Sequence, residues 1–248
     1  MGSSGDQLNE FLSYLDQSLA RISNLCDSAH DGQCRSFKKA LLFSFIDNLS
    51  TLAYPANKSD FAKVRKLITN YGNWPDSNLL STPHLCRWLE THPETFLPSC
   101  LEIAKTKLDE WEPGCIVPIS RDMDYRAIQR HIRSGHEVAA ASIDRLTHLS
   151  LLWNQRHNLI HRFMPIGLNL EFPDDSSPYY ISLSSLSVIM GAPESGPFWQ
   201  LIYPTGFLFN LARTCLAGVS LNLRDKSIDI REHYRAGHYL LEELNQGL

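Results

Sequence analysis

The nine residues from Gln155 to Phe163 read QRHNLIHRF and place two histidines and two arginines around a Leu-Ile pair. Histidine transfers protons near neutral pH, and arginine presents a fixed fork of donors to phosphate oxygens. Side chains of these types suit three different structures. They fit a metal site, a metal-independent site for cleaving phosphodiesters, or the capped end of a helix.

A metal site would rest on His157 and His161, which are four residues apart and share a face of any helix that contains both. Zinc hydrolases with the pattern H-E-x-x-H need a glutamate after the first histidine, and Asn158 occupies that position. No cysteine lies close in sequence. The distant candidates for a third ligand are His131, His136 and His148. We therefore expect no metal and no other cofactor here.

A purely structural role is the second alternative. Apolar residues recur at helical spacing from Ile143 to His161, and Pro165 and Gly167 follow, as expected beyond a helix C-terminus. Arg156 and His161 would then be cationic groups at the negative end of the helix dipole. This alternative assigns no chemistry to the segment, and the sequence alone does not exclude it.

Ribonuclease chemistry is the third alternative. It requires one group that moves protons and another that stabilises the charge of the phosphorane, without a metal. His161 suits the first task and Arg156 suits the second. The two residues are five apart, about 140° around an ideal helix, so they do not share a face there. We expect them to converge only if the helix end deforms or a second subunit completes the site.

Other residues are candidates to bind RNA beside this pair. Arg126, Arg130 and Arg133 occupy positions i, i+4 and i+7 of a predicted helix, so that they line one face, toward a phosphate backbone or toward solvent. Trp153 offers a surface for stacking a base, or a core side chain. Arg162 adds a further positive charge next to His161.

Helical periodicity predicts the elements that position these residues. The predicted helices cover residues 8–26, 34–54, 60–71, 84–90, 96–111, 122–134, 143–161, 204–223 and 227–244. The second is very apolar (KKALLFSFIDNLSTLAYP), and Asp47 interrupts it. A buried carboxylate needs a partner, which would be Arg156 or a histidine, whereas an exposed one would face solvent or another arginine.

A small β element is expected within the helical chain. Residues 167–203 contain LNLEF, a turn Pro-Asp-Asp-Ser-Ser-Pro and YYISLSS, which predict an antiparallel β-hairpin, with a further short strand over residues 198–203. The first five residues, MGSSG, are set aside as an appended or disordered tail. The sequence predicts one mainly α domain over residues 1–248 with a β insertion near residues 167–203.

Composition narrows the class of protein. The 248 residues carry a net charge of −4, so the chain is not a generally basic nucleic-acid binder. It contains no apolar run of about 18 residues and no basic and apolar leader at its start, which argues against a membrane helix and a secretory signal. Its six cysteines form no C-x-x-C pair, as expected of free thiols in a reducing compartment. We expect a cytoplasmic protein without a membrane partner.

The segment also resembles the signature of HEPN domains, in which a histidine follows an arginine after four to six residues and a polar residue follows the arginine. Arg156 to His161 matches this signature, with His157 in the polar position where many relatives carry asparagine. The surrounding LTHLSLLWNQRHNLIHRF, the N-terminal KKALLFSFIDNLSTLAYP and the C-terminal FWQLIYPTGFLFNLARTCL look similar to bacterial HEPN-like proteins.

This resemblance implies a HEPN-like helical bundle in which Arg156 and His161 lie near a dimer interface, so that two protomers form one cleft. Such domains often act as metal-independent endoribonucleases in toxin–antitoxin and phage-defence systems, and others are non-catalytic RNA-binding or protein-interaction modules. His157 and Asn158 would orient RNA or the catalytic pair. The implied partners are RNA, a second copy of the chain, and an antitoxin or defence-system protein.

Overall fold

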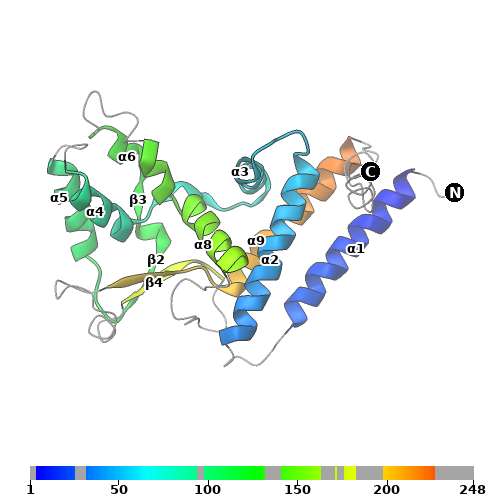
Figure 1. Cartoon of the computed structure of the whole chain (residues 1–248), viewed down its shortest axis with the longest axis horizontal. Coiled ribbons are helices and arrows are strands. Elements are labelled where there is room, and N and C mark those ends of the chain that lie inside the picture. Colours follow the sequence, from blue (N-terminus) through cyan, green and yellow to red (C-terminus); the bar gives the residue numbers. More distant parts are fainter. Residues whose placement is uncertain are drawn as a thin grey trace, which may run out of the picture. The chain divides into compact units, whose positions relative to one another are not determined.

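The computed structural model of the protein describes residues 4–25, 32–93, 98–131, 141–162, 171, 176–182 and 198–226. It is mainly helical with small antiparallel sheets, as the sequence predicts (Figure 1). The chain forms two compact units, one of residues 1–27, 41–73 and 209–248, the other of residues 28–40 and 74–208. Each unit combines segments that are distant in sequence, and a single domain over residues 1–248 stays a prediction. None of the described helices is long and apolar enough to cross a membrane.

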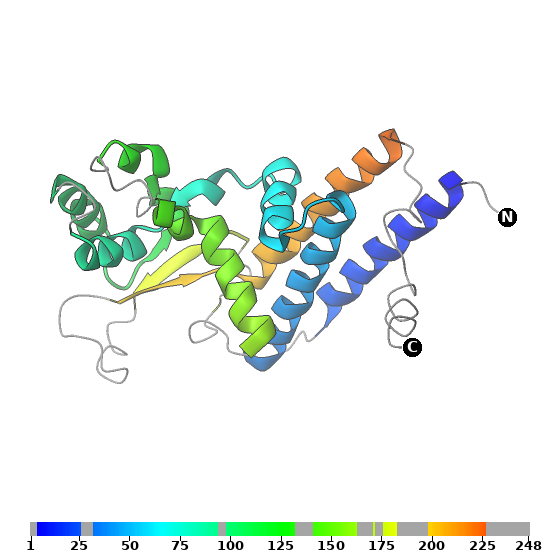
Figure 2. The same cartoon turned by 45° about the horizontal axis from the view of Figure 1, so that its top comes forward.

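The first unit is built from helices. These are α1 (Ser4–Asn24), the part of α2 (Gly32–Ala53) from Leu41 onward, α3 (Asp60–Tyr71), and the part of α9 (Thr205–Asp225) from Phe209 onward. Both cartoon views show the three long helices running alongside one another (Figures 1 and 2). Ser59 caps α3, since its hydroxyl accepts a hydrogen bond from the Ala62 amide. Helix α1 already begins at Ser4, within the segment set aside as a tail.

Two glycines allow close packing in this unit. A Cβ atom on Gly218 of α9 would lie 2.6 Å from the Tyr71 ring and 2.8 Å from Tyr71 Cβ, so only a glycine lets these segments approach. Gly72 ends α3, and a Cβ there would lie 2.6 Å from the Ile68 carbonyl oxygen. The close contact of α3 with α9 therefore depends on the absence of two side chains.

The second unit contains short helices and two small antiparallel sheets. Its helices are η1 (Pro75–Asn78), α4 (Thr82–Thr91), α5 (Pro98–Asp109), η2 (Ile119–Arg121), α6 (Tyr125–Gln129), η3 (Ala141–Leu146) and α8 (His148–Arg162). Its strands are β1 (Leu79–Leu80), β2 (Ile116–Pro118), β3 (Met123–Asp124), β4 (Tyr179–Ser182) and β5 (Trp199–Ile202). One sheet pairs β1 with β3, and the other has the order β2-β4-β5. Buried side chains of α4, α5 and neighbouring segments form an apolar cluster that includes Leu85, Leu89 and Cys100.

The predicted antiparallel β element is confirmed within residues 167–203 by the pairing of β4 with β5. Tyr180 of β4 pairs with Leu201 of β5 on one side and with Val117 of β2 on the other. The predicted strand LNLEF lies outside the described residues except for Glu171. The third strand, β2, comes from residues 116–118, where the sequence predicted no strand.

Two predicted helices are shorter than expected. The helix predicted over residues 143–161 is divided at Thr147, which forms a β-bridge with Leu80 while its hydroxyl accepts a hydrogen bond from the Ser150 amide. Residues before Thr147 form the 3-10 helix η3 instead. The helix predicted over residues 122–134 begins only after the cap Asp124 and ends at Gln129, because residues 123–124 are used by strand β3.

Candidate functional site

The C-terminal end of α8 brings Arg156 and His161 together within one chain. Arg156 Nη1 donates a hydrogen bond to His161 Nε2 at 3.1 Å, on a part of the helix where the His161 side chain is exposed and Arg156 is half-buried. Helix α8 continues to Arg162, past both residues. Our expectation that convergence needs a deformed helix end or a second subunit was therefore wrong. The long arginine side chain spans the difference in angle.

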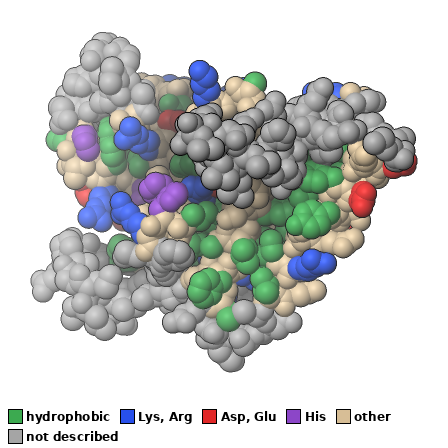
Figure 3. All heavy atoms as spheres, turned by 45° about the vertical axis from the view of Figure 1, so that its right-hand side comes forward, with side chains coloured by type: hydrophobic (Ala, Val, Ile, Leu, Met, Phe, Trp, Pro, Cys, Tyr) green, Lys and Arg blue, Asp and Glu red, His purple; other side chains and the backbone are tan. Residues whose placement is uncertain are grey.

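Two aromatic contacts extend this pair. The Arg156 guanidinium lies over the Trp153 ring, 4.7 Å from its centroid, which is a cation–π contact. The rings of His157 and His161 are 4.7 Å apart and tilted by 51°. His157 and Arg162 are exposed, and Trp153 is half-buried. The segment thus presents a row of basic and aromatic groups to solvent, and Figure 3 shows histidine side chains beside lysine or arginine side chains on one face.

The hydrogen bond between Arg156 and His161 defines the state of the imidazole. An arginine has only donors, so His161 Nε2 must carry a lone pair and the ring proton must sit on Nδ1. In this state the imidazole has a basic nitrogen at the surface, held by the arginine. Movement of the guanidinium toward an anion would expose that nitrogen.

The other predicted RNA-binding arginines lie elsewhere. Arg126 is exposed on α6, Arg130 follows the end of that short helix, and Arg133 lies outside the described residues. Helix α6 therefore contains Arg126 and ends just before Arg130, and the common face of all three arginines stays a prediction. Asp47 lies on α2 in the first unit, whereas Arg156 lies in the second, and a pairing between them stays a prediction. Asn158 is half-buried beside the pair on α8.

The third ligand that the metal alternative requires is not supplied by His148 or His131. His148 is the first residue of α8, about 13 Å along the helix axis from His157, and both its ring nitrogens have protein partners. His131 lies beside the Ser99 hydroxyl. Among the residues described, no group of three or more histidine, cysteine, aspartate or glutamate side chains could hold a metal ion.

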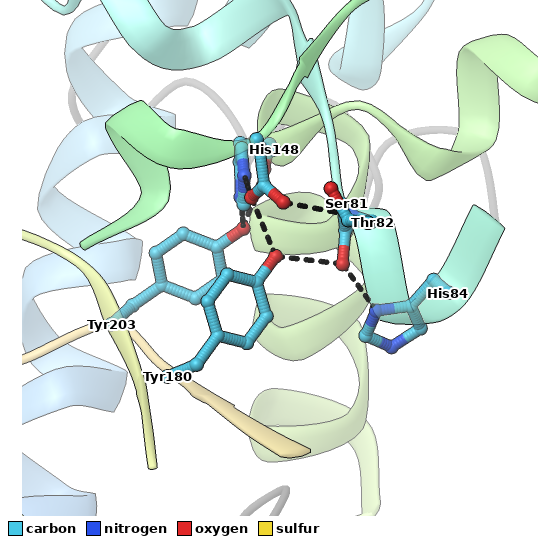
Figure 4. A network of polar contacts seen from close by, with 7 residues as sticks. Ser81, Thr82, His84, His148, Tyr180 and Tyr203 are labelled. Carbon is cyan, nitrogen blue, oxygen red and sulfur yellow. Dashed lines mark hydrogen bonds and ion pairs between the residues drawn. The ribbon is translucent and has the colours of Figure 1, made fainter. Parts of the chain in front are cut away.

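A second polar cluster, which the sequence did not reveal, lies buried at the start of α8 (Figure 4). His148 is completely buried, and its Nε2 lies 2.7 Å from Asp122 Oδ2 while its Nδ1 lies 3.0 Å from the Tyr203 hydroxyl. The Asp122 carboxylate also accepts hydrogen bonds from the Thr82 amide at 2.8 Å and from the Tyr180 hydroxyl at 2.7 Å. These residues come from five separate segments, so no spacing in the sequence connects them.

The chain of contacts continues to the surface. Ser81 Oγ lies 2.7 Å from the Tyr180 hydroxyl and 2.6 Å from Nδ1 of His84, whose side chain is exposed. Ser81 itself is fully buried, so this serine and histidine do not form a nucleophile that a substrate can reach. Burial, with the Asp122 charge nearby, raises the pKa of the Tyr180 and Tyr203 hydroxyls well above 10.0, and both remain neutral donors at physiological pH.

A buried ion pair supports the start of α9 in the second unit. Lys39 of α2 pairs with Glu171, and the other oxygen of that carboxylate accepts hydrogen bonds from the amide and the hydroxyl of Thr205, both at 2.9 Å. Burial lowers the pKa of Lys39, and the Glu171 charge partly offsets this effect. The carboxylate therefore caps α9 from a distant segment.

Comparison with known proteins adds no further information. No protein-family model matches the chain, and neither a curated protein nor a solved structure does so.

Proposed function

We propose that the protein is a HEPN-like, metal-independent endoribonuclease in which Arg156 and His161 act on the scissile phosphodiester. The observation that carries this proposal is the 3.1 Å contact between Arg156 Nη1 and His161 Nε2 at an exposed helix end. A proton-transfer group and a fixed phosphate-binding group are thereby adjacent, in contact with solvent and joined to each other.

The chemistry follows from these two side chains. When Arg156 turns toward a phosphate oxygen, His161 Nε2 is released to accept the proton of the ribose 2′-hydroxyl. The 2′-oxygen then forms a bond to phosphorus, the bond to the 5′-oxygen breaks, and that oxygen takes up the proton that His161 received. Arg156 stabilises the extra negative charge on the phosphorane oxygens. His157 and Asn158 orient the RNA or the pair.

The proposed biological setting follows the resemblance. The protein acts in the cytoplasm as a toxin or phage-defence effector, with RNA as substrate and an antitoxin or defence-system protein as partner. It forms a homodimer that places two Arg156–His161 pairs near the subunit interface. Five cysteines in the described part of the chain are free thiols, which suits a reducing compartment.

The test is cleavage of a labelled RNA pool by purified protein, with and without EDTA. We expect His161→Ala to lower the rate by roughly 10²–10⁴-fold, because it removes the proton-transfer group. Arg156→Ala should lower the rate by a comparable factor, because it removes the group that stabilises the negative charge on the phosphate oxygens. His157→Ala should be milder, and EDTA should have no effect. Both severe variants should keep the wild-type melting temperature, since their side chains are not in the core. An EDTA-sensitive activity that survives Arg156→Ala would contradict the proposal.

A non-catalytic RNA-binding module is the second candidate. The Arg156 guanidinium over the Trp153 ring favours it, because a base can stack on such a platform without being cut. In that case the wild type binds single-stranded RNA but leaves it intact, and Trp153→Ala weakens binding by more than His161→Ala.

A further inference from the structure

We infer that the Arg156–His161 pair binds a phosphodiester anion together with a proton, so that anion binding tightens as the pH falls. The inference deepens the proposed function and takes the class of ligand from it. It concerns how pH regulates anion binding at the site, and it is based on the hydrogen bond between Arg156 and His161.

The closed pair excludes a proton from His161 Nε2, since Arg156 donates to that atom. Imidazole is the side chain that ordinarily changes charge between about pH 5 and 8. If Nε2 gains a proton, both partners become donors with positive charge, and the contact is lost. The pair is therefore a closed state with a neutral imidazole, which competes with an open state in which two cations face each other.

An anion favours the open state. A phosphodiester oxygen can accept hydrogen bonds from both the guanidinium fork and the imidazolium, and its charge offsets their repulsion. The local sequence supplies no substitute, because α8 (HLSLLWNQRHNLIHR) contains two arginines and three histidines but no aspartate or glutamate.

The groups around His161 agree with this coupling. Arg156 donates to His161, the His157 ring lies 4.7 Å from the His161 ring, and Arg162 is the next residue along the chain. The C-terminal end of α8 is a position that suits cations. An anion that accepts from the Arg156 guanidinium frees His161 Nε2, which can then take up a proton and donate to the same anion.

The test uses a single-stranded DNA oligonucleotide. Its phosphodiesters keep one charge each between pH 5 and 8, and it lacks the 2′-hydroxyl, so binding is separated from cleavage. Calorimetry in two buffers with different ionisation enthalpies measures proton uptake. We expect a positive uptake that approaches about one proton per site, and an affinity that rises by up to about tenfold for each pH unit lowered.

Three variants assign the proton. His161→Gln keeps a polar side chain but does not titrate there, and should abolish both the uptake and its share of the pH dependence. His157→Gln should retain them. Arg162→Gln is the matched control, since it removes an exposed charge from the same helix end, weakens binding and keeps the uptake. No binding, or unchanged uptake in His161→Gln, would overturn the inference.

Cleavage of RNA is measured separately on the same preparations. Proton-linked DNA binding without any RNA cleavage leaves the inference standing and refutes the ribonuclease function. RNA cleavage by a protein whose DNA binding takes up no proton supports the function and refutes the inference.

Discussion

Among single residues, Asp122 is central to the polar interior of the second unit. Its side chain is completely buried and accepts from His148, Tyr180 and the Thr82 amide. A buried charge is tolerated only with partners of this kind, and loss of one member leaves the others unpaired. The cluster joins the first residues of α4 and α8 to strand β4, so Asp122 stabilises the start of the helix that carries Arg156 and His161.

We expect Asp122→Asn to lower the free energy of unfolding by about 3–5 kcal/mol, because the neutral amide also turns a donor toward donors. Denaturant titration of the purified variant measures this loss. Asp124→Asn is the matched control. Asp124 is two residues away, exposed and the cap of α6, and asparagine caps as well as aspartate, so the change should stay below about 0.5 kcal/mol. Equal effects of the two substitutions would show that the cluster does not stabilise the fold.

Among the helices and strands, the elements with strong periodicity were predictable and their interruptions were not. The apolar spacing of residues 8–26, 34–54 and 204–223 predicted α1, α2 and α9 to within a few residues. The break at Thr147 was missed because it depends on a β-bridge to Leu80, a contact distant in sequence. For the same reason, β2 could not be assigned from three residues whose partners lie more than 60 positions away.

The candidate site, too, was predictable from the sequence only in part. QRHNLIHRF was recognisable because its chemistry lies in nine consecutive residues. The contact between Arg156 and His161 was not expected, since helix geometry fixes Cα positions and not the reach of a long side chain. The Asp122–His148 pair gave no signal at all, because residues 26 positions apart meet only after folding.

The close packing of α9 against α3 predicts that Gly218→Ala destabilises the protein only while the Tyr71 side chain is present. Gly218→Ala adds a methyl group that would lie 2.8 Å from Tyr71 Cβ, and such overpacking costs about 1–3 kcal/mol. The higher helix propensity of alanine returns up to about 1 kcal/mol, so we expect a net loss of stability. In a Tyr71→Gly background, which removes Cβ as well as the ring, the same substitution should instead stabilise the protein. Thermal unfolding of the four proteins measures both effects, and a loss that persists without Tyr71 would contradict this account of the packing.

For the molecule as a whole, exposed apolar side chains agree with the proposed homodimer. Large hydrophobic side chains gather on the face shown in Figure 3. On α2, Phe37 is 62% exposed, and Leu41 is also exposed one helical turn later. Exposed apolar residues that adjoin in this way favour association, and a closed two-fold contact is the commonest form of oligomer.

We therefore expect light scattering to show a dimer at micromolar concentration. Phe37→Glu should weaken the dimer by about tenfold or more, since burial of a phenylalanine contributes about 1.5–3 kcal/mol. Leu221→Glu is the control, because Leu221 is 60% exposed on α9 and carries the same change of charge. If two protomers share the cleft, RNA cleavage by Phe37→Glu should fall in proportion to the dimer and recover at higher protein concentration. A monomeric wild type that cleaves RNA at full rate would rule out a shared cleft, and Arg156 and His161 of one chain would then suffice.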